Sequence, residues 1–100
     1  MATQVFRDSE TFADGTFYRV VAYVVEPDEQ FVEGVKYSFQ YCDADGENIL
    51  RYDNARHPGT DIPRHHKHVG TDETIEAVEY AGNPVSHREK FENEMEETRE

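Results

Sequence analysis

The chain has 100 residues, of which 10 are Lys or Arg and 22 are Asp or Glu, so its formal net charge is −12 at pH 7. This length fits one domain with a single small core, and the charge argues against binding nucleic acid over the whole surface, because phosphate contacts come from Lys and Arg. The single cysteine, Cys42, excludes an internal disulfide, and no apolar run approaches the roughly 18 residues of a membrane span.

Residues 1–10 lack the basic start and apolar run of a signal peptide, so we expect a cytoplasmic protein that has no contact with a membrane. Only three lysines accompany seven arginines and the 22 acids. Such an acidic, lysine-poor surface is typical of a halophile, in whose cytoplasm salt screens the self-repulsion. The alternative is that the acidic surface meets a basic partner protein.

Two hairpins are predicted in the first half of the chain. The turn Asp14-Gly15 is a strong hairpin signal, because both residues tolerate positive φ. It follows a short mixed run at residues 5–12. Residues 16–26 are rich in β-branched and aromatic side chains and stop before Pro27, which predicts a central strand.

Residues 34–42 alternate with a period of two, which predicts a strand with one buried face. The expected buried side chains are Val35, Tyr37, Phe39 and Tyr41, and the opposite ones are Lys36, Ser38, Gln40 and Cys42. Residues 43–46 form the next predicted turn, and residues 47–53 return as a strand. Its alternation places Ile49, Arg51 and Asp53 on one face and Leu50 and Tyr52 on the other.

Residues 66–69 are expected to form a short strand, and residues 74–80 are ambiguous between strand and helix, with strand favoured. Ser86 is the expected N-cap of a charged C-terminal helix, with Phe91 and Met95 as its apolar anchors. A helix with so thin an apolar stripe either docks by those two residues, binds a partner, or frays. We therefore predict a single α+β domain: residues 1–83 form an antiparallel sheet of four to five strands, with two hairpins in a meander, and residues 84–100 form the helix.

A basic, His-rich loop at residues 51–70 stands out from the acidic background. It has four basic residues against two acidic ones, and it holds four of the five histidines. The basic residues are Arg51, Arg56, Arg64 and Lys67, and the histidines are His57, His65, His66 and His68. Such an island attracts an anion.

His66 and His68 flank Lys67, and in an extended segment residues i and i+2 share a face. Two imidazoles on one face can serve as general acid and base around a phosphodiester, or as two metal ligands. Arg51 and Asp53 also share a face, so the Arg could hold a phosphate while the Asp orients a histidine. The alternatives are a solvated histidine loop and an ordinary surface ion pair.

Five motifs follow one another along the chain: Asp14-Gly15-Thr16, Lys36-Tyr37-Ser38-Phe39-Gln40-Tyr41, Asp43-Ala44-Asp45-Gly46, Arg51-Tyr52-Asp53-Asn54 and His66-Lys67-His68-Val69-Gly70. This ordered set resembles the TumE-type toxin family over roughly residues 7 to 70. The resemblance implies a small cytoplasmic toxin that acts on RNA, encoded beside a DNA-binding antitoxin. The extreme acidity looks like a haloarchaeal version of the family.

The residue types then favour a metal-independent endoribonuclease without a cofactor. RNA cleavage without metal needs a base, an acid and a cation for the phosphorane charge. His66 and His68 would supply the base and the acid, and Asp53 would fix one imidazole. The cation would come from Lys67, Arg51 or Arg64, and substrate contacts would come from Arg51, Arg64, Arg56 and Tyr52.

Two further interpretations stay open. The first is a non-catalytic module that binds phosphate or a protein. The second is a metal-dependent phosphoesterase, with a divalent metal such as zinc held by His57, His66, His68 and Asp53. A homo-oligomer is compatible with each of them.

Overall fold

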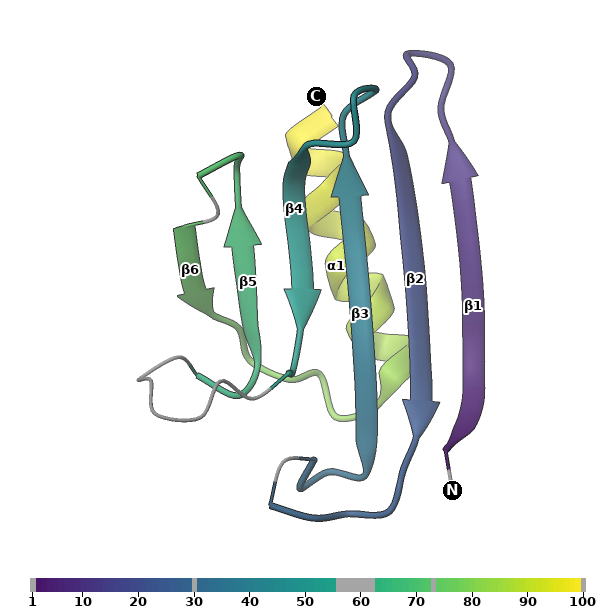
Figure 1. Ribbon diagram of the computed structural model, residues 1–100, viewed down its shortest axis with the longest axis vertical. Coiled ribbons are helices and arrows are strands. Elements are labelled where there is room, and N and C mark those ends of the chain that lie inside the picture. Colours follow the sequence, from purple (N-terminus) through teal and green to yellow (C-terminus); the bar gives the residue numbers. More distant parts are fainter. Residues whose placement is uncertain (1, 30, 56–62, 73, 100) are drawn as a thin grey trace.

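The computed structural model describes residues 2–29, 31–55, 63–72 and 74–99. They form one antiparallel sheet in the order β1-β2-β3-β4-β5-β6, with one helix, α1 (Figure 1). The strands are β1 (Thr3–Thr11), β2 (Phe17–Val24), β3 (Val35–Cys42), β4 (Asn48–Asp53), β5 (His66–Val69) and β6 (Thr74–Ala77). The helix α1 spans Pro84–Arg99. The predicted α+β meander is confirmed.

The sheet has six strands where four to five were predicted. Its edge strands are β1, which includes most of the mixed run at residues 5–12 and pairs with β2, and β6, which covers the first four residues of the strand favoured at residues 74–80 and pairs with β5. Neither edge strand shows a strong apolar alternation, and every residue of β6 is exposed. Edge pairing rests on backbone hydrogen bonds, which the side-chain pattern does not encode.

Helix α1 covers one face of the sheet, behind β3 and β4 in the view of Figure 1. His87, Phe91 and Met95 are its buried residues, at i, i+4 and i+8. The Phe91 ring packs 5.7 Å from that of Phe39 and 5.3 Å from that of Tyr52, measured between centroids. The thin apolar stripe therefore docks the helix on the sheet. No helix among the described residues has the length and apolar character to cross a membrane.

The helix begins earlier than its predicted N-cap. The side-chain Oδ1 of Asn83 accepts a hydrogen bond of 2.8 Å from the backbone N–H of Ser86, and the backbone carbonyl of Asn83 accepts one of 3.0 Å from His87. The prediction of Ser86 as N-cap was wrong. Asn83 caps the helix, and Pro84 occupies the first helical position, where its missing N–H costs nothing.

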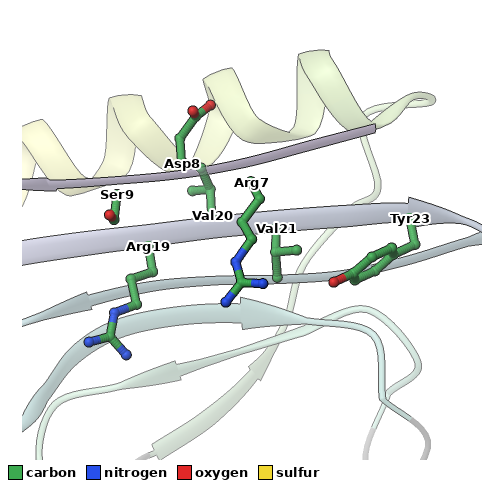
Figure 2. A pocket seen from close by; sticks show the side chains of 7 residues that line it. All are labelled: Arg7, Asp8, Ser9, Arg19, Val20, Val21 and Tyr23. Atoms are coloured by element: carbon green, nitrogen blue, oxygen red, sulfur yellow. The ribbon is translucent and has the colours of Figure 1, made fainter. Parts of the chain in front are cut away.

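The opposite side of the sheet, which we call the uncovered face, has no described helix or strand packed on it. The ladders place these side chains there: Arg7, Ser9, Arg19, Val21, Tyr23, Lys36, Ser38, Gln40, Arg51, Asp53, His66 and His68. Figure 2 shows Arg7, Arg19 and Tyr23 pointing to this side, whereas Asp8 points toward the helix. We call the other side the helix face.

Candidate active site on the uncovered face

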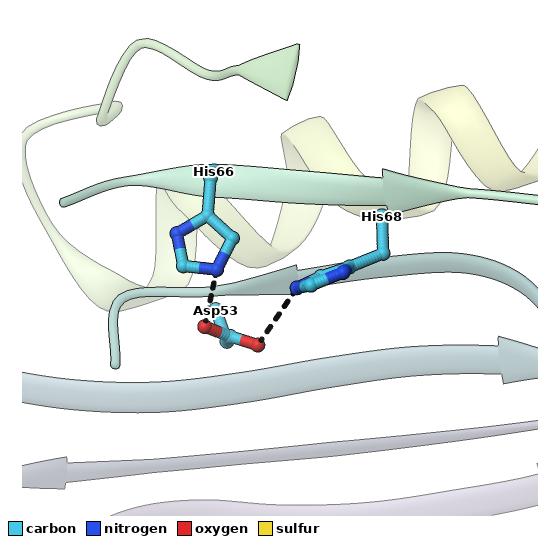
Figure 3. A group of neighbouring side chains, drawn as sticks. All are labelled: Asp53, His66 and His68. Atoms are coloured by element: carbon cyan, nitrogen blue, oxygen red, sulfur yellow. Dashed lines mark ion pairs between the residues drawn. The ribbon is translucent and has the colours of Figure 1, made fainter. Parts of the chain in front are cut away.

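Asp53 lies between two histidines at the end of β4 (Figure 3). Its Oδ1 is 3.0 Å from Nε2 of His66, and its Oδ2 is 3.7 Å from Nε2 of His68. Its Oδ2 is also 3.1 Å from Nε of Arg51. The Asp53 side chain is 4% exposed, so its charge interacts with these three neighbours through little water.

Hydrogen bonds around Asp53 hold the end of β4 in place. The next residue, Asn54, is fully buried and bonds to β3: its Nδ2 donates to the carbonyl of Val35 at 2.7 Å, and its Oδ1 accepts from the N–H of Tyr37 at 3.1 Å. Asp53 Oδ1 accepts from the N–H of Ala55 at 3.1 Å. Asn54 therefore ties β4 to β3, so the neighbouring Asp53 carboxylate has little freedom to move.

The ladder between β4 and β5 brings the histidines to Asp53. His66 lies opposite Asp53, and His68 lies opposite Arg51, so all four side chains share the uncovered face. The side-chain amide of Asn48 donates to the carbonyls of His68 and Gly70, at 3.2 and 3.1 Å, which fixes the far end of β5. The predicted shared face of Arg51 and Asp53 is confirmed by their ion pair.

The hydrogen bonding of His66 defines the state of its ring. Its Nδ1 lies 2.9 Å from the carbonyl oxygen of Pro63 and 3.3 Å from that of Arg64. Carbonyl oxygens only accept, so Nδ1 carries a proton. Nε2 then faces the Asp53 carboxylate across 3.0 Å, a distance too short for two bare lone pairs. This contact suits either an N–H of His66 directed at Asp53 or a cation held between the two side chains.

The same three side chains have the geometry of a metal-binding cluster. One ligand atom each from Asp53, His66 and His68 can be chosen so that all lie within 4.8 Å of one another. Two imidazoles and one carboxylate are a common ligand set for catalytic metals. A ligating histidine usually donates its other ring N–H to a carbonyl, as His66 does. The cluster therefore fits either an ion-paired site or a divalent metal.

Exposure differs among the members of the site. The His66 side chain is fully buried, that of His68 is 11% exposed, and that of Arg51 is 38% exposed. A ligand that approaches from solvent therefore meets Arg51 and His68 first. His66 is placed to act through Asp53.

Two of the predicted site residues point to the helix face. Lys67 lies opposite Tyr52 in the ladder. Its Nζ is 2.8 Å from Oε2 of Glu94 in α1, and the Tyr52 hydroxyl donates to the other oxygen of Glu94. Burial, followed by the bond to Glu94, raises the pKa of Tyr52. In a strand, residues i and i+1 point to opposite faces, so neither Lys67 nor Tyr52 joins Asp53.

Arg64 lies next to β5 and is already paired. Its Nη2 is 2.6 Å from Oε2 of Glu33, and the same oxygen is 3.0 Å from Nε2 of His65. Burial acts to raise the pKa of Glu33, but these two hydrogen bonds outweigh it and lower the pKa. Arg64 is therefore ion-paired with the Glu33 carboxylate in this structure. The predicted contributions of Arg56 and His57 lie outside the described residues.

A second histidine cluster, which sequence reasoning missed, joins the helix to the sheet. The Tyr37 hydroxyl is 2.9 Å from Nδ1 of His65 and 2.9 Å from Nε2 of His87. Nδ1 of His87 accepts from the N–H of Ala81 at 3.2 Å, so its Nε2–H donates to Tyr37, and Tyr37 donates to His65. Burial lowers the pKa of His87 to about 4. The only sequence signal for this cluster is the presence of His87 in an otherwise polar stretch.

Comparison with known proteins gives one match. The family model described as "Toxin TumE" matches residues 1–99 of the chain. Neither a curated protein nor a solved structure matches the chain.

Proposed function

The chain belongs to the TumE toxin family. We propose that it is a toxin that cleaves RNA, with Asp53, His66 and His68 as its active site. Membership of a toxin family implies an antitoxin partner in general. The observation that supports the RNA-cleaving activity best is the position of the two imidazoles and the carboxylate beside Arg51, on the face that the helix leaves open. That the antitoxin binds DNA stays a prediction.

In the metal-independent form of the proposal, His68 is the group that contacts the substrate. Its imidazole takes the proton of a ribose 2′-hydroxyl, the 2′-oxygen bonds to phosphorus, and the bond from phosphorus to the 5′-oxygen breaks. The 5′-oxygen leaves with a proton from water, so the products are a 2′,3′-cyclic phosphate and a 5′-hydroxyl. Arg51 stabilises the added negative charge on the phosphoryl oxygens.

Asp53 and His66 position His68 in this scheme. The Asp53 carboxylate lies 3.7 Å from Nε2 of His68 and stabilises the imidazolium that forms when His68 takes the proton. His66 is buried, and its Nε2 faces the other oxygen of Asp53 at 3.0 Å, so it positions the carboxylate. The sequence assigned acid and base to His66 and His68 alike. Their difference in exposure is the reason for dividing the roles.

The metal-dependent phosphoesterase is the second candidate, and two observations favour it. The three donor atoms lie within 4.8 Å of one another, and Nδ1 of His66 is held by a carbonyl. With His57 outside the described residues, the ligands would be Asp53, His66 and His68. A divalent metal there would supply Lewis-acid stabilisation of the phosphoryl charge.

Cleavage of RNA by the purified protein in molar KCl, with and without EDTA, separates these candidates. We expect cleavage that survives EDTA and falls at least about 100-fold in the His68→Ala variant. Added imidazole should restore part of the lost rate in that variant, because the cavity left by a partly exposed side chain admits it.

The matched control is Lys90→Gln, which removes one charge from the helix face. Cleavage abolished by EDTA and restored by zinc would assign the histidines to a metal. Folded wild-type protein that cleaves no RNA with or without metal would refute the enzyme and leave a non-catalytic binding module.

A further inference from the structure

Apart from Arg51 and Arg64, which pair with Asp53 and Glu33, the described basic side chains fall into two groups by their partners. On the helix face each has a polar partner: Lys67 pairs with Glu94 at 2.8 Å, Arg88 with Asp8 at 2.6 Å, and Arg99 with Asp14 at 3.8 Å, while Lys90 donates to the Glu79 carbonyl at 2.6 Å. On the uncovered face, Arg7, Arg19 and Lys36 are exposed, and among the described residues none of them has a carboxylate within ion-pair distance.

Carboxylates are distributed in the opposite way. Among the described strand residues, Asp8, Glu10 and Glu76 lie on the helix face. Asp53 is the one acid of the described strands that lies on the uncovered face, and its carboxylate already contacts Arg51 and two histidines. In a chain with a net charge of −12, the described strands therefore present unpaired positive side chains on the uncovered face. That face focuses a field that attracts anions.

The ladder register connects these cations to the candidate active site. One row across the sheet runs from Arg19 through Gln40 and Arg51 to His68. The adjacent row runs from Arg7 through Val21 and Ser38 to Asp53. With neighbouring strands about 4.8 Å apart, each row covers about 14 Å.

Aromatic rings accompany the cations on this face. Tyr23 lies beside Arg7 and Arg19 along a shallow cavity of about 470 Å³ (Figure 2). Phe17 lies on the same side of β2, and the Arg19 guanidinium is 5.3 Å from the centroid of its ring. Single-stranded nucleic acid binds where cations track the phosphates and exposed rings stack on the bases. A sheet surface with two or three such rings is sufficient for a few nucleotides.

We propose that the uncovered face binds single-stranded RNA, with Arg7, Arg19 and Lys36 contacting phosphates and Tyr23 stacking on a base. The strand of RNA crosses the sheet from β1 to β5 and delivers one phosphodiester to Arg51 and His68. This inference rests on the proposed RNA-cleaving function and names the surface that would hold its substrate. It also reconciles RNA binding with a net negative chain, because the acids of the described strands other than Asp53 lie on the helix face.

Single-stranded RNA fits this face better than an acidic protein does. The two cationic rows end at a cluster that can cleave a phosphodiester, and a polyanionic peptide would make no use of that cluster. Half-buried Tyr23 and Phe17 offer flat surfaces for bases. An acidic peptide would need only the cations and would not use these rings.

The test measures binding separately from cleavage. The probe is a fluorescent single-stranded RNA of about twelve nucleotides, fully 2′-O-methylated so that the 2′-oxygen cannot attack. Fluorescence anisotropy gives its Kd over a series of KCl concentrations in which circular dichroism shows an intact fold. Unmodified RNA is cleaved in parallel.

The decisive comparison is between two double variants with the same change in net charge. Arg7→Gln/Arg19→Gln removes two cations from the uncovered face, and Arg88→Gln/Lys90→Gln removes two from the helix face. We expect the first to weaken binding about tenfold or more and to reduce the slope of log Kd against log salt by about 1.4, while the second binds like wild type. Tyr23→Ala should weaken binding roughly tenfold.

Three results would overturn the inference. Equal weakening by the two double variants would indicate a general charge effect. Polyglutamate of matched charge that displaces the probe as well as unlabelled RNA does would assign the face to an acidic protein. If Arg7→Gln/Arg19→Gln cleaves unmodified RNA at the wild-type rate, the uncovered face is not the RNA-binding surface, and the proposed function is left intact. Binding without cleavage in wild type would support the surface and refute the enzyme.

Discussion

At the scale of single residues, Asp53 makes more contacts than its position in the sequence predicts. One carboxylate accepts the Ala55 N–H, ion-pairs with Arg51 and faces two imidazoles. The alternation of residues 47–53 predicted that Asp53 shares a face with Arg51. It did not predict which face the helix would leave open.

Replacement of Asp53 by Asn should abolish most of the proposed activity. The amide retains the shape of the carboxylate, but it carries no charge and so does not stabilise an imidazolium on His68. We expect RNA cleavage to fall at least about 100-fold. Initial rates on RNA measure this, with Asp45→Asn in an exposed turn as the matched control. Cleavage within a few-fold of wild type would contradict the role of Asp53.

His87 should make the fold sensitive to acid. Burial, with smaller contributions from His65 and Lys90, lowers its folded-state pKa to about 4 from the ordinary 6.5. The unfolded chain therefore binds this proton first as the pH falls. The stability that neutral His87 contributes is complete above pH ~6.5 and is lost between pH ~6.5 and ~4, on the order of 3 kcal/mol in total.

Urea unfolding at a series of pH values checks this, with wild type compared to His87→Phe. The variant lacks the titrating group, so its stability should depend less on pH between 6.5 and 4. Carboxylates titrate in both proteins and cancel in the difference. Parallel pH curves for the two proteins would show that His87 is not the acid-sensitive group.

At the scale of elements, the helix is held by very few side chains. Its apolar contacts with the sheet come chiefly from Phe91 and Met95, and the Tyr37 hydroxyl anchors it through His87. The sequence predicted Phe91 and Met95 as anchors but left open whether the helix docks, binds a partner or frays. An isolated helix of this length is marginal, so docking on aromatic residues of β3 and β4 decides the outcome.

Truncation of Phe91 should therefore undock the helix. Phe91→Ala removes a fully buried ring that contacts Phe39 and Tyr52, and we expect a loss of about 3–5 kcal/mol in the free energy of unfolding. Val85 lies on the same helix and is 54% exposed, so Val85→Ala should cost less than about 0.5 kcal/mol. Chemical denaturation of both variants measures the difference. Similar losses would mean that the helix is not docked by Phe91.

At the scale of the whole molecule, charge is separated between surfaces while its sum stays at −12. The self-repulsion of such a surface weakens as salt shortens the Debye length, from about 10 Å at 0.1 M to about 3 Å at 1 M. The ion pairs on the helix face weaken too, but 22 acids against 10 bases leave repulsion in excess.

The melting temperature should consequently rise between about 0.1 M and about 1 M KCl. Calorimetry at pH 7 measures it. The same series near pH 5 is the control, because the net charge is small close to the sequence pI of about 4.7 and the rise should shrink there. A melting temperature that is flat or falls with KCl at pH 7 would contradict the interpretation of the acidic surface as an adaptation to salt.

By itself the sequence determined the local geometry of this protein. A period of two at residues 34–42 and 47–53 set which side chains share a face, Asp-Gly turns set the hairpins, and His66-Lys67-His68 set two imidazoles on one side of a strand. These features depend on neighbours within a few residues, so pattern alone predicts them.

Only the tertiary structure decided which of those faces the helix covers. That choice directs Lys67 and Tyr52 to Glu94 and leaves Arg51, Asp53, His66 and His68 on the other side. It also joins Arg7 and Arg19 to the site through the ladder register, and it engages Arg64 with Glu33. Each outcome depends on packing between segments far apart in the chain, where burial and pairing compete, and no short-range pattern records the result.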